Sequence, residues 1–212
     1  MKVELRRHTP IPTAICGEAA ALCTASSDWE KSLRGAMQGG HESVLEHATF
    51  TFLIEDVSRV LLAQITRHRI ASFSVQSQRY VGMGEMPCVT PPTFDDDPEV
   101  LEEYEKVLEH IRWFYEYAVD RGIPKEDARY ATPQAAQTCM IVTMNARELL
   151  HFFSLRCCNR AQWEIRNLAD EMLFLCRQVA PELFKKAGCA CMRGEKCPEG
   201  KMTCGKPRER CG

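Results

Sequence analysis

Several features that identify large classes of protein are missing from this chain of 212 residues. No apolar run approaches the roughly 18 residues that a membrane-spanning helix requires, so we expect no membrane span. No G-x-G-x-x-G follows a predicted strand, because Gly82-Met83-Gly84 lacks the third glycine and the helix, so a Rossmann-type cofactor site is not supported. An internal repeat is absent as well.

An excess of charge is also lacking, since 27 Lys and Arg residues against 29 Asp and Glu residues give a net charge of −2. This balance argues against a general nucleic-acid or anionic-membrane binder, so any basic patch must be local. Residues 1–7 alternate charged and apolar side chains and lack the apolar core of a signal peptide. We therefore expect a cytoplasmic protein whose 12 cysteines are mostly reduced thiols or metal ligands.

Apolar periodicity and capping residues predict many helices and few strands. Capping boxes that begin at Ser27, Ser43 and Asn145 mark three helix starts. We predict an α+β fold in which helices cover a small, mostly antiparallel sheet, with a folded domain over 1–187 and a cysteine-rich tail over 188–212. Strands are expected at 3–5, 49–54 and 138–144, and helices over 13–23, 27–39, 58–66, 98–121, 125–130, 145–157 and 161–187, with a single turn at 43–46 and a loop over 82–97.

Arginine is concentrated in one short segment, where Arg67-His68-Arg69 precedes Ser77-Gln78-Arg79. A guanidinium presents a fixed fork of donors that fits two phosphate or carboxylate oxygens at once. Three guanidiniums so close together repel one another unless an anion lies among them. The segment therefore predicts a nucleotide or phosphate site, and a solvated basic loop is the alternative.

The helix expected from Asn145 places Arg156 on the same stripe as Leu149, Phe152 and Phe153. A buried guanidinium without an acceptor is very costly, so Arg156 needs either an internal carboxylate or a bound ligand. Both alternatives are open from the sequence. One side of a polar pocket could be lined by Asn145, Arg147, His151 and Arg156.

The last 24 residues hold five cysteines with the spacing C-x-C-x5-C-x6-C-x6-C. Four thiolates could bind a structural Zn²⁺ tetrahedrally, but the paired C-x2-C pattern of most zinc sites is missing. A flexible reduced tail is the alternative to a zinc site. The candidate ligands are Cys189, Cys191, Cys197, Cys204 and Cys211.

These residues carry a resemblance to a known family. The segment Arg67-His68-Arg69 followed by Ser77 resembles the R-H-R-x7-S signature of flavin-dependent thymidylate synthases. The resemblance extends from about residue 40 to about residue 185. Further agreement lies in His41-Glu42-Ser43, Glu46-His47, Asn145-Ala146-Arg147, Leu155-Arg156 and 161–165.

The resemblance implies synthesis of dTMP from dUMP, with 5,10-methylenetetrahydrofolate as the carbon donor and NADPH-reduced FAD as the hydride source. It also implies an α+β fold and a homotetramer in which several subunits build each active site. Such shared sites would explain how a chain without a Rossmann motif binds FAD. Arg156 would act as the catalytic group, because it would lie against the N3–O2 edge of uracil and stabilise the anionic ring.

The resemblance also implies binding roles at numbered positions. The family often has Asn at the position of His151 and Glu or Gln at that of Val75, where the backbone or Gln76 would make the contact instead. FAD contacts are implied for Ser43, Arg67, His68, Arg69, Val75, Asn145, Arg147 and His151. Contacts with dUMP are implied for Gln64, Arg67, Gln76, Ser77, Gln78, Arg79, Arg129 and Arg156.

Two other interpretations compete with this one. A non-catalytic nucleic-acid or zinc-binding module would use the arginine cluster and the cysteine tail, and it would be colourless. A flavoprotein of the same fold could instead act on another nucleotide.

Overall fold

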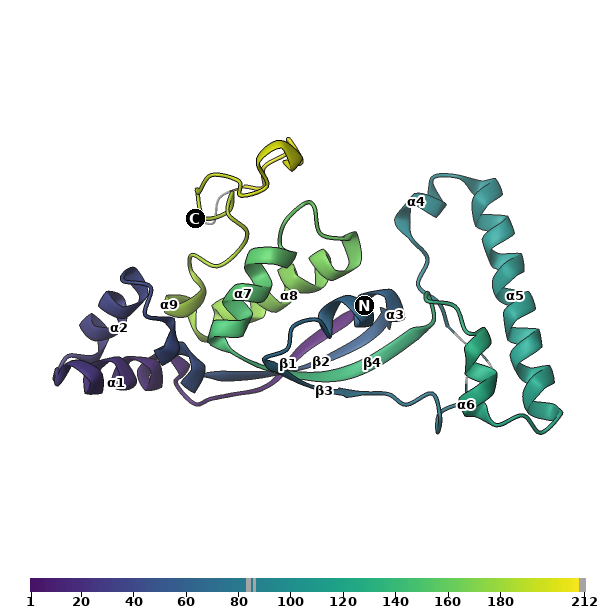
Figure 1. Ribbon diagram of the computed structural model, residues 1–212, viewed down its shortest axis with the longest axis horizontal. Coiled ribbons are helices and arrows are strands. Elements are labelled where there is room, and N and C mark those ends of the chain that lie inside the picture. The colour runs from purple at the N-terminus through teal and green to yellow at the C-terminus, as the bar shows by residue number, and fades with distance from the viewer. Residues whose placement is uncertain (83–84, 86, 210–212) are drawn as a thin grey trace.

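The protein was analysed as a computed structural model, which describes residues 1–82, 85 and 87–209. Four strands form one antiparallel sheet in the order β1-β2-β4-β3 (Figure 1). The predicted α+β fold is confirmed. The strands are β1 (Lys2–His8), β2 (Thr49–Ser58), β3 (Ala71–Val75) and β4 (Gln137–Asn145).

One face of this sheet carries the main core. In β2 the side chains of Phe50, Phe52 and Ile54 are fully buried, while the intervening positions are more exposed, as strand geometry requires. Helices α7 (Ala146–Arg156) and α8 (Trp163–Val179) lie over one side of the sheet (Figure 1). Leu149 and Phe152 of α7 are fully buried, so the predicted apolar stripe of this helix is its core face.

The other helices extend the molecule at both ends of the sheet. Helices α1 and α2 lie at one end, and α4, α5 and α6 form an arm at the other (Figure 1). The arm has a small core of its own, built around Tyr115 and Ala136. Their bounds are α1 (Pro12–Thr24), α2 (Trp29–Gln38), η1 (Glu42–His47), α3 (Arg59–Ile65), α4 (Pro92–Asp95), α5 (Pro98–Asp120), α6 (Lys125–Ala128), η2 (Arg129–Ala131), α9 (Pro181–Phe184) and η3 (Gly200–Met202).

The sequence prediction missed one strand. β3 pairs with β4 from Ala71 to Val75, directly after the arginine cluster. Its exposed positions, Ser72 and Ser74, are small and polar, and its half-buried ones include only one large side chain, Phe73. Five residues with so little apolar contrast carry a weak strand signal, so the pairing depends on the neighbouring strand.

Three helix boundaries also differ from the prediction. Asp28, rather than Ser27, caps α2 by accepting a hydrogen bond from the backbone N–H of Lys31. The turn η1 begins at Glu42, and Ser43 does not cap it. The expected long C-terminal helix is two helices, because proline lacks an N–H and restricts the residue before it; Ala180 leaves the helical region ahead of Pro181.

The tail packs against the turn between α7 and α8 rather than extending freely. Arg208 donates to the backbone carbonyl of Cys157 at 2.9 Å and to the carboxylate of Asp170 at 2.7 Å. Asn159 of the turn donates to the carbonyl of Lys206 at 2.7 Å. The predicted division at residue 187 stays a prediction. Among the described residues, no helix has the length and apolar composition to cross a membrane.

A buried carboxylate stabilises the junction between β2 and α3, the helix that precedes the arginine cluster. Glu164 of α8 is 2% exposed and accepts hydrogen bonds from the backbone N–H of Ser58, at 2.7 Å, and from its hydroxyl. The Ser58 hydroxyl oxygen in turn accepts from the N–H of Leu61 and caps α3. Glu164 therefore fixes the start of the helix that ends just before Arg67.

We expect Glu164→Gln to lower the free energy of unfolding by about 1–3 kcal/mol, because one of the two Ser58 donors loses its charged acceptor in a buried position. Urea unfolding followed by circular dichroism would measure this. Glu171→Gln, on the exposed side of α8, is the matched control and should change stability by no more than about 0.5 kcal/mol. Equal stability of the two variants would contradict the role of Glu164.

Candidate active site

The centre of the candidate site is the imidazole of His68, which follows α3 and is 4% exposed. Among the described residues, the side chains that contact this ring through hydrogen bonds or aromatic packing all come from one face of α7. Positions 148, 151, 152 and 156 are spaced i, i+3, i+4 and i+8, so they share one helical face. The rings of Phe152 and His151 meet the His68 ring edge-on, with centroids 5.0 and 5.7 Å away.

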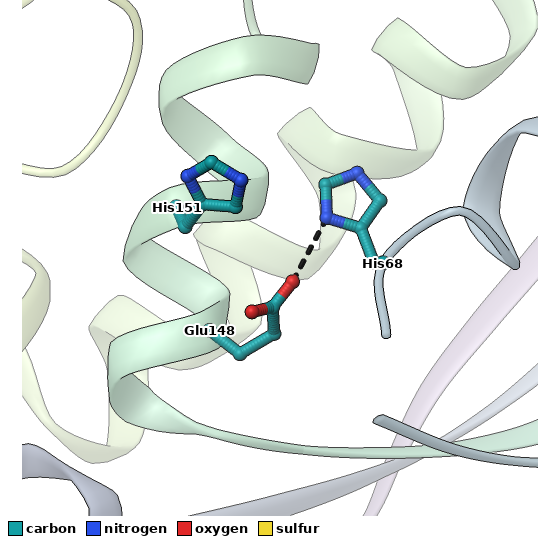
Figure 2. Close-up of side chains that lie close together, drawn as sticks. All are labelled: His68, Glu148 and His151. Carbon is teal, nitrogen blue, oxygen red and sulfur yellow. Dashed lines mark hydrogen bonds and ion pairs between the residues drawn. The ribbon is translucent and has the colours of Figure 1, made fainter. Parts of the chain in front are cut away.

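Two hydrogen bonds fix the orientation of this ring. A hydrogen bond joins His68 to Glu148 (Figure 2), with Nδ1 and Oε1 2.9 Å apart. On the other side, Nε of Arg156 donates to Nε2 of His68 at 3.2 Å. Because the guanidinium can only donate, Nε2 must accept, and the ring proton must reside on Nδ1 and point to Glu148. His68 is therefore neutral in this arrangement.

Burial lowers the pKa of His68 below its ordinary value, and the hydrogen bond with Glu148 opposes this shift in part. The charges of Arg156 and His151 lower the pKa further. The electrostatics thus agree with the neutral ring that the hydrogen-bond geometry requires.

Arg156 itself has no carboxylate within ion-pair distance among the described residues. Besides His68, its guanidinium reaches the carbonyl of Gln64, with Nη2 and O 3.5 Å apart. Burial lowers its pKa, and so does the nearby charge of Arg67. The sequence left two acceptors open for Arg156, an internal carboxylate or a bound ligand. No described carboxylate binds Arg156 directly, and its guanidinium keeps donors free for a ligand.

A second group of cations lies at the other end of α3. Arg79 pairs with Glu126, with Nε and Oε2 2.7 Å apart, and Nε of Arg129 donates to the carbonyl of Glu126 at 3.0 Å. Burial lowers the pKa of Arg59, and the charge of Arg129 lowers it further. Among the described residues, Arg59 and Arg129 have no acidic side chain within ion-pair distance, so this group carries an excess of positive charge, which suits a dianionic phosphate.

Two residues of these groups were missing from the sequence-based site. Arg59 occupies the first turn of α3, where a cation opposes the helix dipole, and this unfavourable placement was a usable signal. Glu148 was interpreted as half of a capping box. Asn145 does accept from the N–H of Glu148 at 2.8 Å, but the Glu148 carboxylate turns to His68 instead of capping the helix.

Comparison with known proteins agrees with the resemblance of the motifs. A profile of the family described as Thymidylate synthase complementing protein matches residues 4–182. This chain belongs to that family. A flavin-dependent thymidylate synthase of Geobacter sulfurreducens is 50% identical over 224 residues, which cover 99% of this chain and 96% of the relative. Its counterpart in Clostridium tetani is 44% identical over 237 residues, covering 99% and 95%.

The fold of the family is shared as well. The crystal structure of the Helicobacter pylori flavin-dependent thymidylate synthase, complexed with FAD and dUMP, resembles this chain with a TM-score of 0.72 and 29% identity. The match covers 89% of this chain and 100% of that one.

Most of the remaining positions with implied FAD contacts lie around the start of α7, whereas Val75 pairs with Met140 of β4, away from that helix. Arg147 is exposed and pairs with Glu46, at 2.5 Å between Nη1 and Oε1, which places it beside η1 and Ser43. His151 lines an open cavity of about 580 Å³ between α2, α7, α9 and the tail. Arg69 is exposed, and Val75 is half-buried on β3.

Within a single chain, five of the positions with implied dUMP contacts form two separate groups. Gln64, Arg67 and Arg156 lie near His68, while Arg79 and Arg129 lie near Glu126. Ser77 is half-buried, and its hydroxyl accepts from the N–H of Arg79 at 3.3 Å. Gln78 is buried, and Gln76 lines a separate cavity of about 490 Å³ beside β4.

In the described part of the chain, one group of possible metal ligands brings three ligand atoms within 4.8 Å of one another, and it consists of His68, Glu148 and His151. The hydrogen bond between His68 and Glu148 already accounts for their approach. In the tail, Sγ of Cys189 and Sγ of Cys191 are 3.4 Å apart, no third thiol completes such a group, and Cys211 lies outside the described residues. Zinc binding by Cys189, Cys191, Cys197, Cys204 and Cys211 stays a prediction.

The lowered pKa of His68 predicts a pH dependence of stability. The unfolded state, with a histidine pKa of about 6.5, binds the proton more readily than the folded state, so the free energy of unfolding should fall as the pH drops below about 6.5. Chemical unfolding between pH 5 and 8 would measure the slope. His68→Gln, which can still donate to Glu148 and accept from Arg156, should flatten it, whereas the exposed control His47→Gln should not. An unchanged slope in His68→Gln would contradict the assignment.

Proposed function

We propose that this chain makes dTMP by reductive methylation of dUMP, with 5,10-methylenetetrahydrofolate as the carbon donor and NADPH-reduced FAD as the hydride source. The observation that carries the proposal is the guanidinium of Arg156, held by His68 and Gln64 beside Arg67 without a carboxylate partner among the described residues. A site built in this way needs an anion to complete it.

Arg156 would bind the N3–O2 edge of uracil and stabilise the ring as an anion. Negative charge then extends toward C5, which attacks the methylene group carried by the folate. The stabilisation is electrostatic and preorganised, because His68 and the Gln64 carbonyl hold the guanidinium before the substrate arrives. This route requires no cysteine nucleophile. Cys88, whose pKa is raised by burial, is a poor candidate for one.

The donors near α7 fit FAD, which is an anionic dinucleotide. Arg67 and Arg69 have no acidic partner within ion-pair distance among the described residues, so they can bind phosphate oxygens. When bound, FAD supplies the hydride that reduces the transferred methylene to methyl. Both nitrogens of His68 are engaged within the chain, so its ring would contact the flavin by packing. FAD would be held by Ser43, Arg67, His68, Arg69, Val75, Asn145, Arg147 and His151.

The second cation group would hold the phosphate of dUMP. Arg79 and Arg129 are its expected members, and the structure adds Arg59 beside Arg129. The two groups lie at opposite ends of α3, whose seven residues span about 10 Å at 1.5 Å of helix rise per residue. We infer that a neighbouring subunit of a cytoplasmic homotetramer completes each site. The exposed aromatic residues of the α5 arm, Trp113 and Phe114, support subunit contacts.

The first test of this function is whether the purified protein is a flavoprotein that turns over dUMP. A visible flavin absorbance and tritium release from 5-labelled dUMP are expected, whereas a colourless protein would contradict the proposal. A yellow protein that releases no tritium would indicate another nucleotide substrate.

Arg156→Ala should retain FAD yet lose most turnover, because the anionic ring loses its preorganised cation. Arg6→Ala, on exposed β1, is the control. Turnover like that of the wild type in Arg156→Ala would refute the role of Arg156.

A second test addresses the phosphate. Arg129→Gln should raise the KM for dUMP by roughly 10- to 100-fold, since a charge-assisted hydrogen bond contributes about 1.5–3 kcal/mol, and should change kcat less. Deoxyuridine lacks the phosphate, so the ratio of kcat/KM for dUMP to that for deoxyuridine should be smaller in Arg129→Gln than in the wild type. Steady-state kinetics with both compounds would measure this, with Arg6→Gln as the control. An unchanged KM would place the phosphate elsewhere.

A further inference from the structure

We propose that Glu148 is a positioning residue of this site, which fixes the tautomer of His68 and thereby holds the Arg156 guanidinium in place. The role of Arg156 rests on the function proposed above. Glu148 is one link further from the substrate, and it acts through His68 rather than on the reacting atoms.

The geometry that carries this inference is a chain of two hydrogen bonds through one imidazole. Glu148 is 7% exposed and His68 is 4% exposed, so water does not compete freely for these groups. The carboxylate accepts from Nδ1 at 2.9 Å, and Nε2 accepts from Arg156 at 3.2 Å. Glu148 projects from α7 toward the ring of His68 in Figure 2.

An indirect link leaves Arg156 available for a ligand. A guanidinium has five N–H donors, and a carboxylate bound to it directly could occupy two of them. Here His68 and Gln64 each take one donor, so the other donors stay free.

A carboxylate is needed at this position because it can only accept a hydrogen bond. In Glu148→Gln the amide can turn its NH₂ group toward Nδ1, and the ring proton then moves to Nε2. Nε2–H cannot accept from Arg156, so the guanidinium loses its support although the shape of the side chain is kept. Glu148→Gln thus separates tautomer control from packing.

We expect Glu148→Gln to lower kcat by about tenfold or more while FAD content stays at the wild-type level. The same change introduced into Arg156→Lys should have little further effect, because both act through one guanidinium. The control is Glu171→Gln, which changes an exposed carboxylate of α8 outside this chain of hydrogen bonds; it should preserve kcat per bound flavin. Glu148→Gln with kcat like that of the wild type would overturn the inference.

A second readout does not depend on catalysis. Solid-state NMR of ¹⁵N-histidine-labelled protein, with His68→Gln to assign the signal, reports which nitrogen of His68 carries the proton. At pH 8 we expect Nδ1–H alone in the wild type and a mixture that includes Nε2–H in Glu148→Gln, because the amide can present either its oxygen or its NH₂ group to Nδ1. A wild-type ring protonated on Nε2, or stoichiometric metal at His68, Glu148 and His151, would overturn the inference. If the protein shows the expected tautomers but makes no dTMP, the proposed function is refuted while the role of Glu148 in orienting His68 stands.

Discussion

The rest of the site depends on the hydrogen bonds between His68 and α7. His68 and Glu148 are separated by 80 residues in sequence, and His68 and Arg156 by 88. Through these contacts the loop after α3 and one face of α7 become one unit, which is anchored by the buried core residues of α7. Phe152, fully buried on the same helix, packs against the His68 ring and keeps water from the polar chain.

Around that unit, the distribution of charge explains what the fold can bind. Arg67 and Arg156 lie close to each other, and Arg59 lies close to Arg129, while the carboxylate of Glu126 pairs with Arg79. Such arrangements are unfavourable in an isolated chain, since like charges repel and burial penalises each cation. An anionic ligand would relieve both penalties at once, although the chain as a whole carries a net charge of −2.

Local signals predicted much of the architecture and of the site. Asn145 caps α7 as the capping box indicated, and the β-branched and aromatic residues over 49–54 marked the start of β2, which continues to Ser58. The prediction failed where local and tertiary preferences differ. β3 is too short and too polar to be recognised alone, and the carboxylate of Glu148 was assigned to a helix cap because its partner, His68, is distant in sequence.

By itself, the sequence determined the helix periodicity, the caps, the cationic segment at residues 67–79 and the need of Arg156 for an acceptor. Only the tertiary structure decided that this acceptor is the Nε2 of a neutral His68, that Glu148 orients that ring, and that Arg59 joins Arg129. The physical reason is the range of each interaction. Periodicity and capping involve residues within about four positions of one another. Hydrogen bonds between distant side chains exist only once the sheet and helices have packed.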